Sequence, residues 1–228
     1  NAVHGLDVRD ELTGDSTRIR ARQIVNVAGP WVDDVLRGLD AARPEQRLIG
    51  GTRGSHVIVP RWPGAPQSAI YFESERDGRP ILIIPWNGMM LLGSTDERHI
   101  GDPGRAVATR AEIDYLLEET NRLIPAARLR TEDILYTYAG VRPLPRSDAG
   151  ETGEITRRHI IHNHAPEVPG LRSVVGGKLT THRSLAEEVV DAVSKDLDRR
   201  TQCTTGQLPL PGAEGMGSSA LNPLLVTR

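Results

Sequence analysis

One short segment near the carboxyl end of the chain combines the residue types that bind anions. Gly176 and Gly177 follow an apolar run, and Lys178 comes next, just before an expected helix. Two glycines let the main chain turn sharply off a strand, and the N–H groups at a helix start favour negative charge. The sequence therefore predicts an anion-binding loop, with Thr180 and Thr181 supplying hydroxyls and a cap. A capped helix beside a solvated lysine is the alternative that these residues leave open.

A second glycine, Gly29, has a similar setting. It follows a short apolar run that ends at Ala28, and Pro30 then suits the first turn of a helix. A strand that ends in glycine lets the backbone approach a ligand closely, and the helix beyond it favours an anion. A tight turn with Trp31 as a core anchor is the alternative.

Arg142 is the third candidate, at the expected end of a strand. Pro143 follows it and fixes the backbone there. A guanidinium group in this position is suited to clamp a phosphate with two parallel hydrogen bonds. A structural ion pair is the alternative.

Three histidines, His159, His162 and His164, occur on one segment. On a strand, His162 and His164 would point to the same side, as a pair of metal ligands does. No carboxylate or cysteine stands at ligand spacing, so surface histidines are the favoured interpretation and no metal is predicted.

Composition excludes several classes of protein. The 228 residues carry a formal net charge of −2, with 38% hydrophobic and 25% charged residues, which is typical of a globular protein and not of a basic nucleic-acid binder. Cys203 is the only cysteine, so an intrachain disulfide is impossible and a reducing, cytoplasmic setting is expected. The sequence contains no run of 18 apolar residues, no signal peptide and no G-x-G-x-x-G. It opens at Asn1 directly in a strand-like pattern, so we expect a piece of a longer protein.

Hydrophobic periodicity and turn residues place these segments on elements. Two strand–glycine–helix units flank an antiparallel block with its own helix, which predicts an α/β domain interrupted by an inserted α+β domain. The expected strands lie at 5–10, 17–22, 23–28, 55–59, 69–73, 80–86, 89–95, 134–141, 155–162 and 171–175, and the expected helices at 31–39, 109–124 and 181–197. The first two strands are expected to form a hairpin, and Asn87-Gly88 is expected to be the turn between 80–86 and 89–95. Thr109 and Glu112 predict a capping box, and residues 40–54 a crossover between domains.

Seven stretches in order resemble the FAD-dependent glycerol-3-phosphate dehydrogenase family of D-amino-acid-oxidase-like flavoproteins. Residues 26–31 and 176–183 stand nearly in the family's form, although His182 occupies a position where Tyr is usual. The seven stretches are 25–31, 54–60, 84–86, 93–96, 138–144, 155–157 and 176–183.

The resemblance implies oxidation of sn-glycerol 3-phosphate to dihydroxyacetone phosphate, with FAD accepting a hydride. It implies that Arg142 and Arg157 bind the substrate phosphate and that Lys178 lies close to substrate and flavin. His56 would be a substrate-side residue and candidate acid/base, since the ordinary pKa of histidine suits that task. The implied catalytic residues are His56, Arg142 and Lys178, and the implied flavin-binding residues are Ala28, Gly29, Gly177, Lys178, Leu179 and Thr180.

The resemblance also implies a domain order. Residues 1–53 and 135–200 would form a partial FAD-binding, Rossmann-like domain, interrupted by an antiparallel-sheet substrate domain at 54–134, with 201–228 as a linker. The family's N-terminal G-x-G-x-x-G loop is not in these residues. We therefore expect this chain alone to bind FAD weakly or not at all and to be inactive.

Two alternative functions remain compatible with the sequence. An oxidase that passes electrons to oxygen, and a non-catalytic module that keeps the substrate-domain sheet, are the alternatives. For the family function, the resemblance implies quinone as the electron acceptor. It is compatible with a homodimer and with peripheral association at the inner face of the cytoplasmic membrane, and it implies no nucleic-acid partner.

Overall fold

The computed structural model of the protein describes residues 2–39, 47–147, 155–199 and 201–213. The chain divides into two compact units, Asn1–Lys178 and Leu179–Arg228. The predicted crossover at 40–54 and the tail at 201–228 lie partly outside the described residues. The predicted domain boundaries at 53, 134 and 200 stay predictions.

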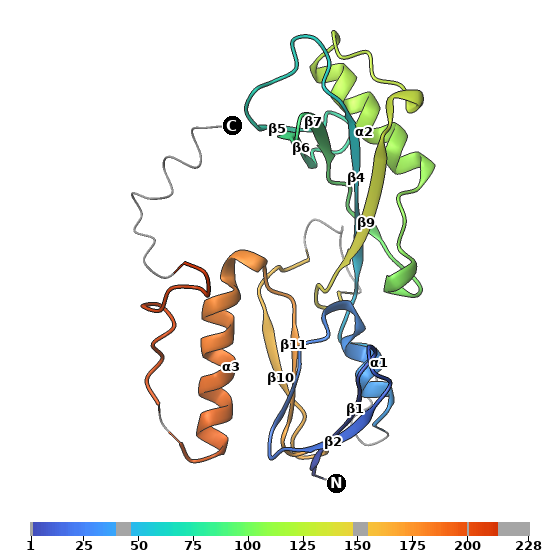
Figure 1. Cartoon of the computed structure of the whole chain (residues 1–228). Helices are drawn as coiled ribbons and strands as arrows, with labels where there is room; N and C mark the ends of the chain where they lie inside the picture. The colour runs from blue at the N-terminus through green and yellow to red at the C-terminus, as the bar shows by residue number, and fades with distance from the viewer. Residues whose placement is uncertain (1, 40–46, 148–154, 200, 214–228) are drawn as a thin grey trace. The chain divides into compact units, whose positions relative to one another are not determined.

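A six-stranded antiparallel sheet is the larger part of the first unit (Figure 1). The strand order is β5-β6-β7-β4-β8, and β9 also pairs with β4. The predicted turn between β6 and β7 is confirmed: Asn87 and Gly88 have φ of 48° and 77°, the left-handed pair that a tight hairpin requires. The strands are β4 (Thr52–Pro60), β5 (Ile70–Glu73), β6 (Pro80–Trp86), β7 (Met89–Gly93), β8 (Glu97–Arg98) and β9 (Tyr136–Arg142).

Helix α2 (Arg110–Leu123) lies alongside this sheet and covers one face of it. The predicted capping box is confirmed, because Thr109 and Glu112 exchange hydrogen bonds at the start of the helix. Alternate residues of β4, Val57 and Val59, are buried in the core with Leu116 of α2. The intervening residues of β4, including His56, therefore face the opposite side of the sheet.

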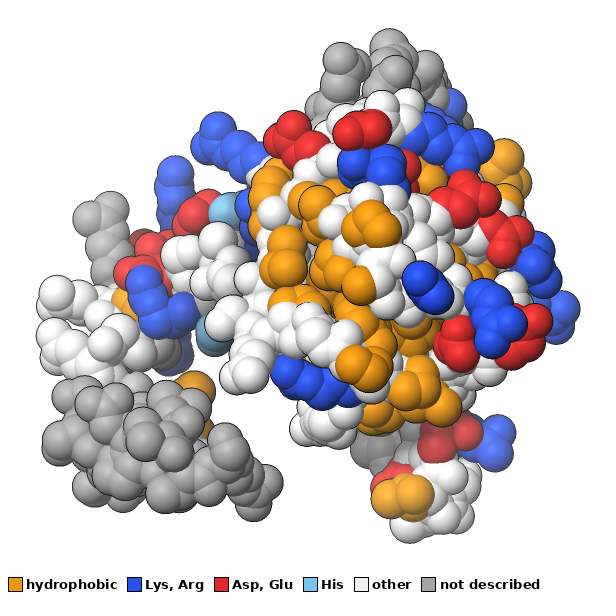
Figure 2. Space-filling view, turned by 90° about the horizontal axis from the view of Figure 1, so that it is seen from above, with side chains coloured by type: hydrophobic (Ala, Val, Ile, Leu, Met, Phe, Trp, Pro, Cys, Tyr) orange, Lys and Arg blue, Asp and Glu red, His pale blue; other side chains and the backbone are white. Residues whose placement is uncertain are grey.

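That opposite side keeps several large apolar side chains in contact with solvent. Tyr71, Trp86 and Tyr136 are each exposed by half or more of their surface. Figure 2 shows hydrophobic side chains that lie between charged ones on the surface seen there. The candidate site described below lies on the same side of the sheet, at its other end along β4 and β9.

A three-stranded sheet forms the remainder of the first unit's core. Strand β11 (Leu171–Val175) lies in the middle, antiparallel to β10 (Ile160–Asn163) and parallel to β3 (Ile24–Asn26). Every residue of β11 is buried, as expected for a central strand. After β3 come a 3-10 turn, η1 (Gly29–Trp31), and α1 (Val32–Arg37), whose Val32 and Leu36 pack against this sheet. The predicted hairpin is confirmed as β1 (Gly5–Arg9) and β2 (Ser16–Arg20).

The second unit begins with a 3-10 turn, η6 (Leu179–Thr181), and continues as α3 (His182–Asp196). The predicted helix at 181–197 is confirmed. The strand predicted at 155–162 is shorter than expected, since only Ile160–Asn163 pair with a neighbour. None of the described helices is long and apolar enough to cross a membrane.

Candidate functional site

Arg142 ends β9 and lies flat on the sheet, over Gly54 of β4. A Cβ atom at Gly54 would collide with the guanidinium group of Arg142, so only glycine leaves room for this arrangement. Nη1 donates to Asp96 Oδ1 at 3.0 Å, and Nη2 donates to Ser94 Oγ at 2.8 Å and to the carbonyl of Thr95 at 3.1 Å. Arg142 therefore has the ion pair that its alternative interpretation predicted. Within the described residues it still has two of its five N–H groups to offer a ligand.

A second guanidinium group lies within electrostatic reach of Arg142. Burial is the main cause that lowers the pKa of Arg142; Asp96 acts against it, and the positive charge of Arg157 lowers it further. Arg157 itself is exposed. Two like charges repel unless an anion joins them, so this pairing favours a ligand with more than one negative charge.

His56 stands beside Arg142 on the same side of the sheet. Its ring stacks on Tyr138 with centroids 4.7 Å apart and planes 7° from parallel. A Cβ atom at Gly93 would collide with the ring, so that glycine gives His56 its place. Nδ1 is buried and has no hydrogen-bond partner among the described residues. Burial, and secondly the charge of Arg142, lower the pKa of His56, which therefore stays neutral near pH 7.

The two glycine turns predicted to bind a ligand come to one edge of the three-stranded sheet. Strands β3 and β11 run parallel with Ser173 opposite Asn26, so their carboxyl ends coincide. Gly29 follows one strand with φ of 57°, and Gly176 and Gly177 follow the other with φ of 79° and 87°. A Cβ atom at Gly29 would meet nothing within 4 Å, which leaves open space beside that turn.

The turn after β11 also adjoins the arginine site. The N–H of Gly176 donates to the carbonyl of Pro143, the residue after Arg142, at 2.8 Å. On its other side, a Cβ atom at Gly176 would come within 2.8 Å of the carbonyl of Arg158, the neighbour of Arg157. The structure therefore brings the segments of Arg142, Arg157 and Gly176 together, although about 15 to 34 positions separate them in the sequence.

Three other predicted site residues lie at the boundary between the two units. Lys178 is the last residue of the first unit and is exposed. Leu179 and Thr180 belong to the second unit, and both are exposed. Their predicted place against a flavin stays a prediction.

The interpretation of the three histidines as surface residues is wrong for His164. Only 5% of His164 is exposed, its Nε2 lies 2.9 Å from Ser173 Oγ, and its ring meets His162 edge to face at 4.6 Å. Burial is the first cause that lowers its pKa to about 4; His162 adds to that effect and Glu167 opposes it. Among the described residues no group of three potential ligands could hold a metal ion.

Sequence reasoning missed the residues that hold Arg142. Ser94 and Asp96 belong to a stretch that carries the family resemblance, but their partner is 46 or 48 positions away and no local pattern connects them. Glu112 was expected only as a capping residue, and it proves to be the most heavily hydrogen-bonded carboxylate of this region.

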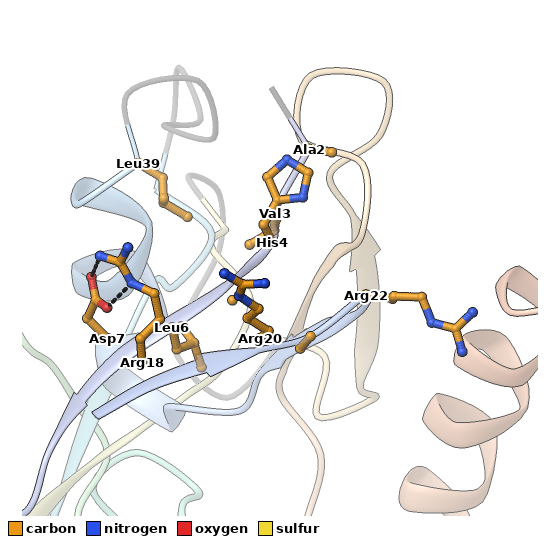
Figure 3. A pocket seen from close by; sticks show the side chains of 11 residues that line it. Ala2, Val3, His4, Leu6, Asp7, Arg18, Arg20, Arg22 and Leu39 are labelled. Carbon is orange, nitrogen blue, oxygen red and sulfur yellow. Dashed lines mark hydrogen bonds and ion pairs between the residues drawn. The ribbon is translucent and has the colours of Figure 1, made fainter. Parts of the chain in front are cut away.

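A separate hollow of about 950 Å³ opens beside the β1–β2 hairpin (Figure 3). Figure 3 shows the ion pair of Asp7 and Arg18 together with His4 and Arg20, which also line this hollow. None of the predicted site residues lines it.

The fold and the geometry of the site indicate a class of protein. Two glycine turns follow adjacent parallel strands at their carboxyl ends, where α/β proteins commonly bind ligands, and the antiparallel sheet of the same unit carries basic side chains. The sequence profile of one family, FAD dependent oxidoreductase, matches residues 1–183. The chain belongs to this family.

Individual relatives are more specific. The chain is 46% identical over 223 residues to a glycerol-3-phosphate dehydrogenase of Synechocystis, covering 94% of this chain and 40% of that protein. It is 36% identical over 222 residues to an aerobic glycerol-3-phosphate dehydrogenase of Staphylococcus haemolyticus, covering 95% and 39%. The crystal structure of the glycerol-3-phosphate dehydrogenase from Bacillus halodurans, complexed with FAD, matches with a TM-score of 0.82 and 33% identity, covering 98% of this chain and 42% of that one. The chain thus spans about two fifths of the length of these relatives.

Proposed function

We propose that this chain is part of an FAD-dependent enzyme that oxidises sn-glycerol 3-phosphate to dihydroxyacetone phosphate. Arg142 lies within electrostatic reach of both His56 and Arg157, and this is the observation that carries the proposal. The names of the relatives support the same substrate.

The two arginines would bind the substrate phosphate. A phosphate monoester near neutral pH carries close to two negative charges and three acceptor oxygens. Arg142 offers two remaining N–H donors among the described residues, and Arg157 adds a second positive charge within electrostatic reach. Lys178 would add a third cation two residues beyond the turn at Gly176. A zwitterionic amino-acid substrate has a single carboxylate and would leave part of this positive charge without an anionic partner.

His56 would take the proton of the C2 hydroxyl. Its pKa is lowered, so the ring is neutral and able to accept a proton at working pH. Its Nδ1 is buried, so Nε2 is the ring nitrogen that a substrate hydroxyl would meet. The C2–H bond would break as a hydride while the hydroxyl proton passes to the ring, which leaves the ketone.

The chain offers a fitting surface for part of FAD. Gly29, with open space at its Cα, and Gly177 form two main-chain turns at one sheet edge, where a flat ring can approach the backbone. Ala28 and Lys178, of the same unit, would add to this surface. The flavin-binding role of Leu179 and Thr180 is supported by the family resemblance alone. When bound, FAD supplies the hydride acceptor.

Steady-state kinetics of the natural protein that contains this sequence, loaded with FAD, test the proposal. We expect Arg142→Ala to raise KM for glycerol 3-phosphate at least about tenfold, the usual cost of a lost charge-assisted hydrogen bond. We expect His56→Asn to lower kcat about 100-fold or more, as loss of a general base does. Arg110→Ala, which removes an exposed arginine of α2, is the matched control and should change neither. Glycerol oxidised as efficiently as glycerol 3-phosphate would contradict the phosphate site.

The electron acceptor and assembly are proposals of the same kind. Quinone as acceptor, a homodimer and peripheral association at the inner face of the cytoplasmic membrane are supported by the family resemblance alone. Comparing oxygen with a soluble quinone as oxidant separates dehydrogenase from oxidase.

A further inference from the structure

Glu112, in the first turn of α2, is a buried carboxylate with more partners than a helix cap needs. Only 4% of it is exposed. Oε2 accepts hydrogen bonds from the Thr109 N–H at 2.9 Å and hydroxyl at 2.7 Å, and from Arg53 Nη2 at 2.7 Å. Oε1 accepts from the hydroxyl groups of Ser55 and Thr95, both at 2.8 Å. One side chain thus joins α2, β4 and the segment that follows β7.

The segment after β7 turns its side chains alternately to the two sides of the sheet. Thr95 points to Glu112, on the side of α2. Its two neighbours, Ser94 and Asp96, point the other way and accept hydrogen bonds from Arg142. The Thr95 carbonyl accepts a third bond from the same guanidinium group. Glu112 and Arg142 therefore hold one three-residue segment from opposite sides.

The backbone of β4 adds to this connection. The N–H of Ser55 donates to Thr95 Oγ1 at 2.8 Å, and the N–H of Thr95 donates to the Ser55 carbonyl at 3.3 Å. Thr95 Oγ1 thus accepts from β4 and donates to Glu112, so the hydroxyl is satisfied in both directions. Its removal leaves a buried N–H and a buried carboxylate each short of a partner.

We propose that Glu112 is a positioning residue for Arg142, acting through Thr95. This inference rests on the phosphate-binding role proposed above for Arg142. The guanidinium group is at the end of a long flexible side chain, and it binds an anion best when it is already held in place. Ser94 and Asp96 hold it, Thr95 fixes the segment on which they lie, and Glu112 fixes Thr95 to the start of α2.

NMR of the ¹⁵N-labelled natural protein that contains this sequence observes the guanidinium group directly, without substrate. We expect resolved Nη–H resonances of Arg142 in the wild type, assigned by their loss in Arg142→Lys, because three hydrogen bonds restrict rotation of the group. In Glu112→Gln and Thr95→Val the guanidinium group should rotate more freely, so its separate Nη–H resonances should merge into an average signal. Thr95→Ser keeps the hydroxyl and should restore the wild-type signals. Glu119→Gln is the matched control, because Glu119 is equally buried in α2 but bonds to Arg122 and not to the segment after β7.

Titration of the same proteins with sn-glycerol 3-phosphate separates this inference from the proposed function. We expect Glu112→Gln and Thr95→Val to weaken binding about tenfold, as loss of one well-placed charged contact does, and Thr95→Ser and Glu119→Gln to stay within about twofold. Averaged Arg142 signals in Thr95→Val, together with no binding by the wild type, would support the positioning role and contradict the phosphate site. Arg142 signals unchanged in Thr95→Val would overturn the positioning role whatever the affinities. If Glu112→Gln does not fold, the pair Thr95→Val and Thr95→Ser decides.

Discussion

Buried charges hold Arg142 on the six-stranded sheet, whereas neutral hydrogen bonds hold the turn that follows β3 in the three-stranded sheet. In the first, Glu112 accepts from Arg53 and from three hydroxyl groups, and Asp96 pairs with Arg142.

The neutral network of the three-stranded sheet is centred on one side-chain amide. Asn26 Nδ2 donates to the Val32 carbonyl at 3.0 Å and to Ser173 Oγ at 3.4 Å, and its Oδ1 accepts from the Ala28 N–H at 3.2 Å. His164 reaches the same hydroxyl of Ser173 from the other side.

The difference follows from what each sheet presents. A basic side chain that must stay charged while half-buried needs anionic partners nearby, and those partners must be fixed in turn. A main-chain turn offers N–H dipoles and needs only its shape preserved, which an amide and a hydroxyl can do. Variants of the charged network should decrease the free energy of unfolding most, because removal of a buried charge leaves its partner unpaired.

The largest effect is expected from Glu112→Ala. It leaves Arg53, whose side chain is 16% exposed, and two buried hydroxyls without their acceptor. Loss of one partner of a buried pair costs about 3–5 kcal/mol, so we expect that decrease in the free energy of unfolding in urea. Glu118→Ala, at an exposed position of the same helix, should cost no more than about 0.5 kcal/mol. A decrease in the free energy of unfolding below about 1 kcal/mol for Glu112→Ala would contradict the conclusion that buried charges stabilise the six-stranded sheet.

Acid should act on the two sheets in different pH windows. Burial opposes ionisation of Glu112, but its hydrogen bonds to Thr109, Thr95 and Arg53 dominate and lower its pKa from 4.5 to about 2. A carboxyl whose pKa is lower in the folded state stabilises above pH 4.5, and that stabilisation is lost as pH falls to 2.

His164 has its pKa lowered by burial, from 6.5 to about 4, so the folded state holds the neutral ring and loses stability as pH falls from 6.5 to 4. Each window should remove about 3 kcal/mol, since one unit of pKa difference corresponds to about 1.4 kcal/mol. Urea midpoints measured from pH 7 to 2 check this. His164→Asn should abolish the upper step alone, and Glu112→Gln the lower step alone; one variant removing both steps would show that the two sheets are not separate in this respect.

The smallest effect is expected from Asn26→Ala in the neutral network. Loss of a buried amide that bonds Val32, Ser173 and Ala28 should cost about 2 kcal/mol. Asn163→Ala, in the exposed position at the end of β10, removes one local bond to the Ala165 N–H and should cost about 0.5 kcal/mol. Equal costs for the two variants would show that the turn at Gly29 does not depend on Asn26.

Much of the fold could be predicted because its signals are local. The turn at Asn87–Gly88, the capping box of α2 and the glycines after β3 and β11 are each recognisable within a few residues. Burial of His164 could not be predicted in this way. A histidine at a strand end is usually exposed, and this one is buried because Ser173 of the neighbouring strand offers a hydroxyl at hydrogen-bond distance.

The sequence by itself determined most of the elements, the two glycine turns and the candidate residue Arg142, and the family resemblance added Arg157 and His56. Only the tertiary structure decided that β4 pairs with both β7 and β9, and this pairing places Ser94 and Asp96 against Arg142 and Thr95 against Glu112. The reason is physical. Hydrophobic periodicity and turn residues are signals within a few positions of the sequence. An ion pair depends instead on distance in space, and the pairing of strands brings Arg142 and Asp96, 46 positions apart, to 3.0 Å.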